Sequence, residues 1–135
     1  MNRALREKLI PELRARGFKG SLPNFHRIKA AGADYLTIQF WSSGGRFVVE
    51  IAKCGPDGLG PGYDTPLNKL NPSYFSRRLR LGSSPESGTL DHWFEFGPQS
   101  YEPPTPPKPF SHYEAIAASV VPFIETQAEK WWNDC

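Results

Sequence analysis

The chain has 135 residues and a formal net charge of +2, with 39% apolar, 13% aromatic and 22% charged residues. This length predicts one domain over 1–135, and the composition excludes a generally disordered chain. The small net charge gives no indication of nucleic-acid binding on its own. No apolar run approaches the roughly 20 residues that span a bilayer, and the start lacks a signal-peptide pattern. Cys54 and Cys135 provide no disulfide framework, so a cytoplasmic protein is expected.

The first predicted element is an amphipathic helix over residues 2–16. Leu5, Leu9 and Leu13 recur at a spacing of four residues and form its apolar side. This periodicity is typical of a helix that packs against a core. Because Pro11 removes one helical hydrogen bond, we expect a kink near Glu7.

A strand pair over residues 34–41 and 46–52 is the strongest pattern in the chain. Apolar and polar side chains alternate in both segments, and Ser42-Ser43-Gly44-Gly45 between them predicts a tight hairpin. Weaker strand patterns lie at 24–28, 77–81 and 90–96. The segment 54–73 is interrupted by glycines and prolines, which predicts a long loop.

The C-terminal part of the chain begins with a proline-rich crossover and ends with a helix. Six prolines in residues 97–109 favour an extended spacer, although P-x-x-P spacings of this kind can also dock in an aromatic groove. Ser111 and Glu114 form a capping-box pattern at the helix start. The apolar stripe of the helix includes Trp131, and Pro122 is expected to bend it.

This order of elements predicts an α+β fold. An antiparallel sheet of four or five strands is expected, packed on one face by an N-terminal and a C-terminal helix. Both helices need a surface on which to bury an apolar stripe, and the sheet offers the only large one. The residues expected to face them are Leu36, Ile38, Phe47, Val49, Ile51, Leu79, Leu81 and Phe94.

The sequence contains no assembled catalytic or metal-binding group, so we expect a non-enzyme without cofactor, metal or catalytic residues. Cys54 paired with His26, His92 or His112 has no supporting local signature, and a small enzyme using Cys54 is the least favoured function. The histidines are too scattered to indicate metal ligands. The Gly-rich stretch 55–62 lacks the Gly-Lys-Ser/Thr ending of a phosphate loop.

The sheet face opposite the helices is the main candidate binding site. If the apolar residues point to the core, alternation directs a second set of side chains outward. Tryptophan and arginine in that set are the residue types that dominate interface hot spots. The alternative is that both tryptophans pack under the long loop or the bent helix. The residues predicted to bind a partner are Gln39, Trp41, Arg46, Glu50, Arg78, Arg80, Trp93 and Glu95.

Several short motifs follow one another in a recognisable order. They are Arg16-Gly17-Phe18-Lys19, Phe25 with Arg27, Leu36-Thr37-Ile38-Gln39, Phe47-Val48-Val49-Glu50-Ile51, Arg78-Leu79-Arg80-Leu81-Gly82, and Trp93 with Phe94. This order resembles the bacterial family known as domain of unknown function 4304, over nearly the whole chain. The resemblance implies a small α+β domain with an antiparallel sheet and no established reaction.

Small bacterial domains of this kind often accompany secreted toxins as immunity proteins, which is an argument from association. The leading hypothesis is therefore a non-catalytic protein-binding domain, an immunity protein (antitoxin) that binds and neutralises a cognate secreted toxin. The alternative is a single-stranded nucleic-acid-binding domain in which Tyr35, Trp41 and Trp93 stack on bases. Acidic residues on the same face, among them Glu50 and Asp91, count against that alternative. No membrane partner is expected.

Overall fold

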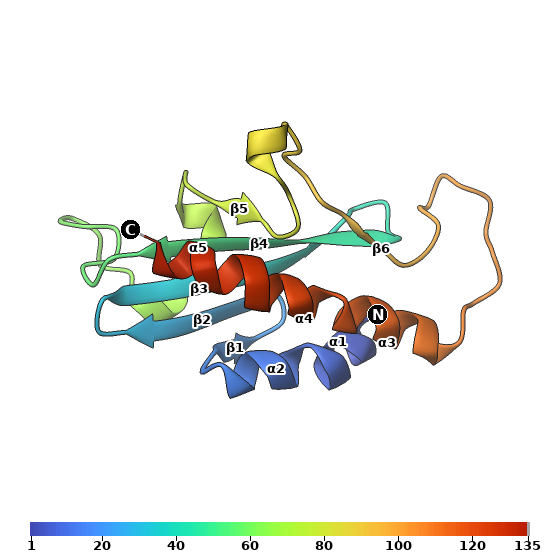
Figure 1. The fold of residues 1–135 in the computed structure, drawn as a ribbon, viewed down its shortest axis with the longest axis horizontal. Coiled ribbons are helices and arrows are strands. Elements are labelled where there is room, and N and C mark those ends of the chain that lie inside the picture. Colours follow the sequence, from blue (N-terminus) through green and yellow to red (C-terminus); the bar gives the residue numbers. More distant parts are fainter. Residues whose placement is uncertain (135) are drawn as a thin grey trace.

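The computed structural model describes residues 1–134 and contains a six-stranded antiparallel sheet with helices across one face (Figure 1). The strands lie in the order β1-β2-β3-β4-β5, and β6 pairs with β4. The antiparallel α+β class is confirmed. The strands are β1 (Lys19–Ser21), β2 (Asn24–Lys29), β3 (Gly32–Phe40), β4 (Arg46–Cys54), β5 (Leu79–Arg80) and β6 (Phe94–Glu95).

The β3–β4 hairpin is the centre of the sheet, as the alternating pattern predicted. Two short strands pair with the edge of β4 that faces away from β3. Strand β5 pairs with Glu50 and Ile51, and β6 pairs with Arg46 and Phe47. Both edge strands are therefore shorter than the predicted segments 77–81 and 90–96. Strand β1 was not predicted, since its three residues are all exposed and have no apolar alternation.

The N-terminal helix is interrupted at Leu9, so it forms α1 (Asn2–Lys8) and α2 (Ile10–Ala15). The expected kink near Glu7 thus lies two residues later in the chain. Pro11 occupies the first turn of α2. Backbone N–H groups in a first turn have no carbonyl partner within the helix, so the missing N–H of proline is tolerated there. The leucines at 5, 9 and 13 are fully buried, which confirms the predicted stripe.

The C-terminal helix begins at Phe110, and the capping-box prediction is wrong. Pro109 is the cap residue and no side chain in the described chain caps the helix, because Ser111 already lies within the first turn. The helix consists of α3 (Phe110–Ala118), α4 (Val120–Phe123), the π-helical turn η4 (Ile124–Ala128) and α5 (Glu129–Asn133). Its interruption at Ser119 precedes Pro122, whose missing N–H leaves the Ala118 carbonyl without its helical donor.

The π-helical turn changes which tryptophan enters the core. Such a turn takes up one more residue than an α-helical turn, and Ile124, Ala128 and Trp132 consequently share the buried side. Trp131, which the sequence placed on the stripe, is only half-buried and lies between Lys53 and Arg77. The long C-terminal helix lies across the sheet and beside α1 (Figure 1).

The helix-covered face of the sheet forms the main core, and all eight residues predicted for it are buried there. The opposite face is covered only in part. The segment after β4, which contains η1 (Leu67–Lys69) and η2 (Pro72–Tyr74), folds back over Ala33, Tyr35 and Ala52. Tyr35 is therefore buried, and its hydroxyl donates a 2.9 Å hydrogen bond to the Leu67 carbonyl. The expectation that Tyr35 stands on an open face is wrong.

His26 on β2 makes the stability of the fold sensitive to pH. Burial lowers the pKa of His26 below its usual 6.5, and nearby Lys19, Lys69 and Arg14 lower it further. At this residue the unfolded chain therefore binds more protons than the folded chain as the pH falls from 6.5 to the lower pKa of the folded state. We expect the stability contributed by neutral His26 to be complete above that pH and to be lost as the pH falls.

Urea unfolding of the wild type and His26→Gln over a series of pH values tests this prediction. The wild type should lose stability relative to His26→Gln as the solution is acidified, because glutamine does not titrate. Parallel curves for the two proteins would show that His26 makes no such contribution.

Candidate binding surface on the sheet

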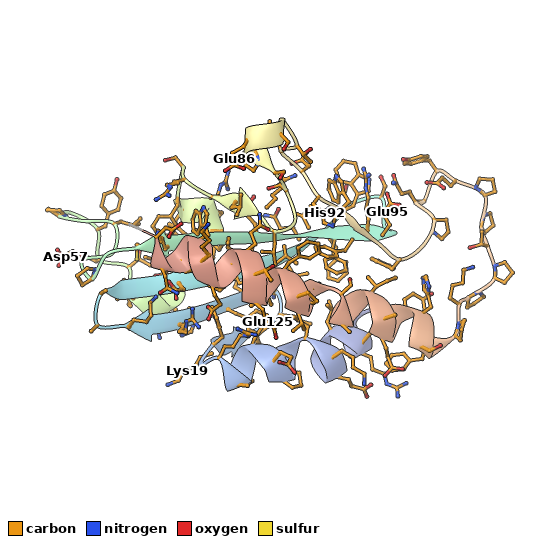
Figure 2. All side chains as sticks on the ribbon, viewed as in Figure 1. Lys19, Asp57, Glu86, His92, Glu95 and Glu125 are labelled. Carbon is orange, nitrogen blue, oxygen red and sulfur yellow. The ribbon has the colours of Figure 1, made fainter. Side chains whose placement is uncertain are left out.

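The predicted site residues share the face of the sheet that the helices leave free. Gln39 lies opposite Val48, Glu50 lies opposite Arg80, and Arg46 lies opposite Glu95. Residues opposite each other in an antiparallel pair point to the same side. The buried core residues alternate with them, so this set points away from the helices. Figure 2 shows Glu95 at the β6 end of the sheet, far from Asp57 in the loop after β4.

Trp41, Arg46 and Trp93 form a tryptophan–arginine cluster at the β6 end. The two indole rings lie 5.3 Å apart at 78°, edge to face. The guanidinium carbon of Arg46 lies 4.9 Å from the centre of the Trp41 ring and 4.2 Å from that of Trp93. Trp41 is 38% exposed and belongs to neither apolar core cluster. The alternative in which both indoles are enclosed by the loop or the helix is therefore not what the structure shows.

Glu50, Arg78, Arg80 and Asp91 form an ionic cluster beside the first one. Arg78 Nη1 lies 3.3 Å from Glu50 Oε1, and Arg80 Nε lies 3.4 Å from Glu50 Oε2. Arg80 Nη1 also donates a 2.7 Å hydrogen bond to Asp91 Oδ1. Two arginines and two carboxylates thus neutralise one another within the cluster.

Glu50 was predicted to be available to a partner, but the structure buries it. It is only 5% exposed, and the arginines of the ionic cluster lie against its carboxylate. Its contribution to the surface is therefore indirect, through the positions of Arg78 and Arg80. An open hollow beside it is lined by Leu90 and Ser83, two residues that strand alternation did not indicate because both lie outside the strands of the structure.

The nucleophile candidates considered from the sequence are not brought together as a pair. Cys54 Sγ lies 3.5 Å from the hydroxyl of Tyr35. His112 contacts the Phe96 carbonyl, and the ring of His92 packs on Phe94. Burial raises the pKa of Tyr35, and its contact with Cys54 raises it further.

Two kinds of feature are absent from residues 1–134. No group of three or more His, Cys, Asp or Glu side chains in this part of the chain is arranged to hold a metal ion. Likewise, no helix among these residues is long and apolar enough to cross a membrane.

The family model of the domain of unknown function DUF4304 matches residues 9–102. The chain belongs to this family. The resemblance inferred from the motifs is thereby confirmed, and every predicted site residue of this DUF4304 domain lies inside the matched segment. Helices α3 to α5 follow it. No curated protein and no solved structure matches the sequence.

Proposed function

We propose that this domain binds another protein through the open part of its sheet, around the tryptophan–arginine cluster. The observation that supports this is the half-exposed Trp41–Arg46–Trp93 arrangement on strands that are otherwise well packed. When a partner covers such indoles, apolar surface is removed from water. Little side-chain entropy is lost, because the indoles are already held in place. The hairpin beneath them is rigid, since β3 and β4 pair along their full length.

The partner that we propose is a secreted toxin, which the domain binds and neutralises as an immunity protein. This finer proposal is supported by association, because small bacterial domains without a known reaction often accompany toxins. A non-catalytic role requires only a stable surface of defined shape. The sheet supplies such a surface, and its sequence lies within the segment shared with the family.

Single-stranded nucleic acid has less support as a partner. Base stacking needs free aromatic faces, while Trp41 and Trp93 contact each other and Arg46. Tyr35 is buried under the loop. The arginines at 78 and 80 are already paired with carboxylates.

The test is co-expression of the domain with the protein encoded by the adjacent gene. We expect the wild-type domain to form a stable complex and to protect the cell from that protein. Trp41→Ala and Trp93→Ala should each weaken the complex by about 2 kcal/mol, or roughly thirtyfold in Kd, because each removes an interface indole. Isothermal titration calorimetry measures the loss.

The matched control is Tyr63→Ala, which truncates an aromatic residue that is 65% exposed in the loop after β4. Its affinity should equal that of the wild type. If both tryptophan variants also bind like the wild type while remaining folded, the sheet surface is not the binding site.

A further inference from the structure

Arg46 differs from the other arginines of the sheet surface in having no anionic partner among residues 1–134. Arg78 and Arg80 are paired with Glu50 and Asp91, whereas the ion pairs and side-chain hydrogen bonds of the described chain include none from Arg46. Its Nε is buried without a hydrogen-bond partner. Glu95 lies opposite it in register and is exposed, yet forms no ion pair with it. The positive charge of Arg46 is thus not compensated locally.

The guanidinium of Arg46 is nevertheless held in place. Its carbon and the two indole centres form a compact triangle with sides of 4.2, 4.9 and 5.3 Å. A guanidinium held against aromatic rings loses little side-chain freedom when it forms an ion pair. Its N–H donors are therefore already positioned for an acceptor brought by a partner.

The chemistry of the surroundings favours a carboxylate over a phosphate backbone. A nucleic acid needs several uncompensated cations to replace its counterions, and the neighbouring arginines are neutralised. Exposed Glu95 adds negative charge beside the cluster, which repels a chain of phosphates more strongly than a single carboxylate. One available cation flanked by apolar rings matches a single acidic side chain on an otherwise apolar patch. A planar carboxylate also fits the two-pronged donor geometry of arginine.

We propose that Arg46 is the receptor for an aspartate or glutamate side chain of the partner protein. The two indoles contact the apolar surface around that acid. This inference rests on the proposed function, because it specifies the chemistry of the partner for the same surface. The other arginines of this surface, Arg78 and Arg80, already have carboxylate partners and require no anion from the partner protein.

A selection of random linear peptides displayed on phage tests this proposal, because it requires no identified partner. The full-length domain is immobilised, and peptides that it retains are synthesised and titrated by calorimetry. Titrations compare the wild type with Arg46→Met, Arg46→Lys and Trp93→Ala. Arg6→Met is the matched control, because Arg6 is exposed on α1 and distant in sequence from the cluster.

We expect the retained peptides to be enriched in Asp or Glu and to lose about tenfold or more in affinity for Arg46→Met. Arg46→Lys should recover part of the loss, and Arg6→Met should have no effect. Changing the peptide acid to its amide should cost a similar factor with the wild type and almost nothing with Arg46→Met. This coupling would identify the pair directly.

Three results would overturn the proposal in different ways. Peptides that need Trp93 but bind Arg46→Met as tightly as the wild type would refute the acidic contact and leave the binding surface intact. Peptides that are indifferent to both Trp93→Ala and Arg46→Met would contradict the surface and the acidic contact together. A labelled oligothymidylate that binds the wild type and loses affinity for Arg46→Met would identify phosphate as the occupant instead.

Discussion

Trp132→Ala is expected to lower the free energy of unfolding by about 3–5 kcal/mol, the range for truncating a large aromatic in a core. Trp132 is 4% exposed, and its ring centre lies 5.1 Å from that of Phe18. Its indole N–H donates a 3.1 Å hydrogen bond to the Ala52 carbonyl on β4. The substitution would therefore remove one of the contacts that join α5 to the sheet. Urea denaturation followed by circular dichroism measures the change.

Trp131→Ala is the matched control for this prediction. The two tryptophans are adjacent in sequence, but Trp131 is half-buried and lies between the cations of Lys53 and Arg77. Its truncation should cost about 1 kcal/mol, consistent with a partly exposed side chain. Equal destabilisation of the two variants would contradict the assignment of Trp132, rather than Trp131, to the buried side of the helix.

The sheet could be predicted from the sequence because alternation in a strand has only two phases. Once the apolar residues of 34–41 and 46–52 were assigned to one side, the opposite side followed for every strand that pairs with them. This is why the eight core residues and the placement of Arg46, Arg80 and Glu95 agree with the structure. Aromatic and arginine residues in the outward phase then indicated the surface.

The features that could not be predicted depend on contacts between distant parts of the chain. Nothing in the glycine- and proline-rich pattern shows that Leu67 and Leu70 return to cover Tyr35. Nor does an apolar helical stripe reveal a π-helical turn. In the structure, this turn places Trp132 rather than Trp131 on the buried side. A local sequence pattern indicates the secondary structure of a segment. Which other segment packs over it depends on the tertiary structure.

The site itself divides in the same way. Its side-chain types and the face they occupy follow from sequence, whereas their pairing does not. Arg78 and Arg80 are neutralised by Glu50 and Asp91, while Arg46 forms no ion pair with the opposite Glu95 and packs on the indoles instead. This difference decides which arginine retains a charge for a partner, and it could be obtained only from the positions of the side chains.

Arg27→Met is expected to destabilise the fold by about 3–5 kcal/mol, because it leaves a buried carboxylate without its main partner. Asp34 is 1% exposed and accepts hydrogen bonds from Arg27 Nε at 3.0 Å and Nη2 at 2.8 Å. Arg27 Nη2 also donates a 2.6 Å hydrogen bond to Glu129 Oε1 on α5. Methionine retains most of the apolar stem, so the loss should be mainly electrostatic. Urea denaturation at neutral pH provides the measurement.

The double variant Arg27→Met/Asp34→Asn tests this electrostatic explanation. Asparagine removes the uncompensated charge at nearly the same volume, so the double variant should be more stable than Arg27→Met alone. Lys29, which also lies 2.9 Å from Asp34 Oδ2 but is more exposed, should be less important. Lys29→Met is thus expected to cost about 1 kcal/mol or less. A double variant less stable than Arg27→Met would mean that Arg27 acts mainly through its packing on Phe18, 4.6 Å away, rather than through Asp34.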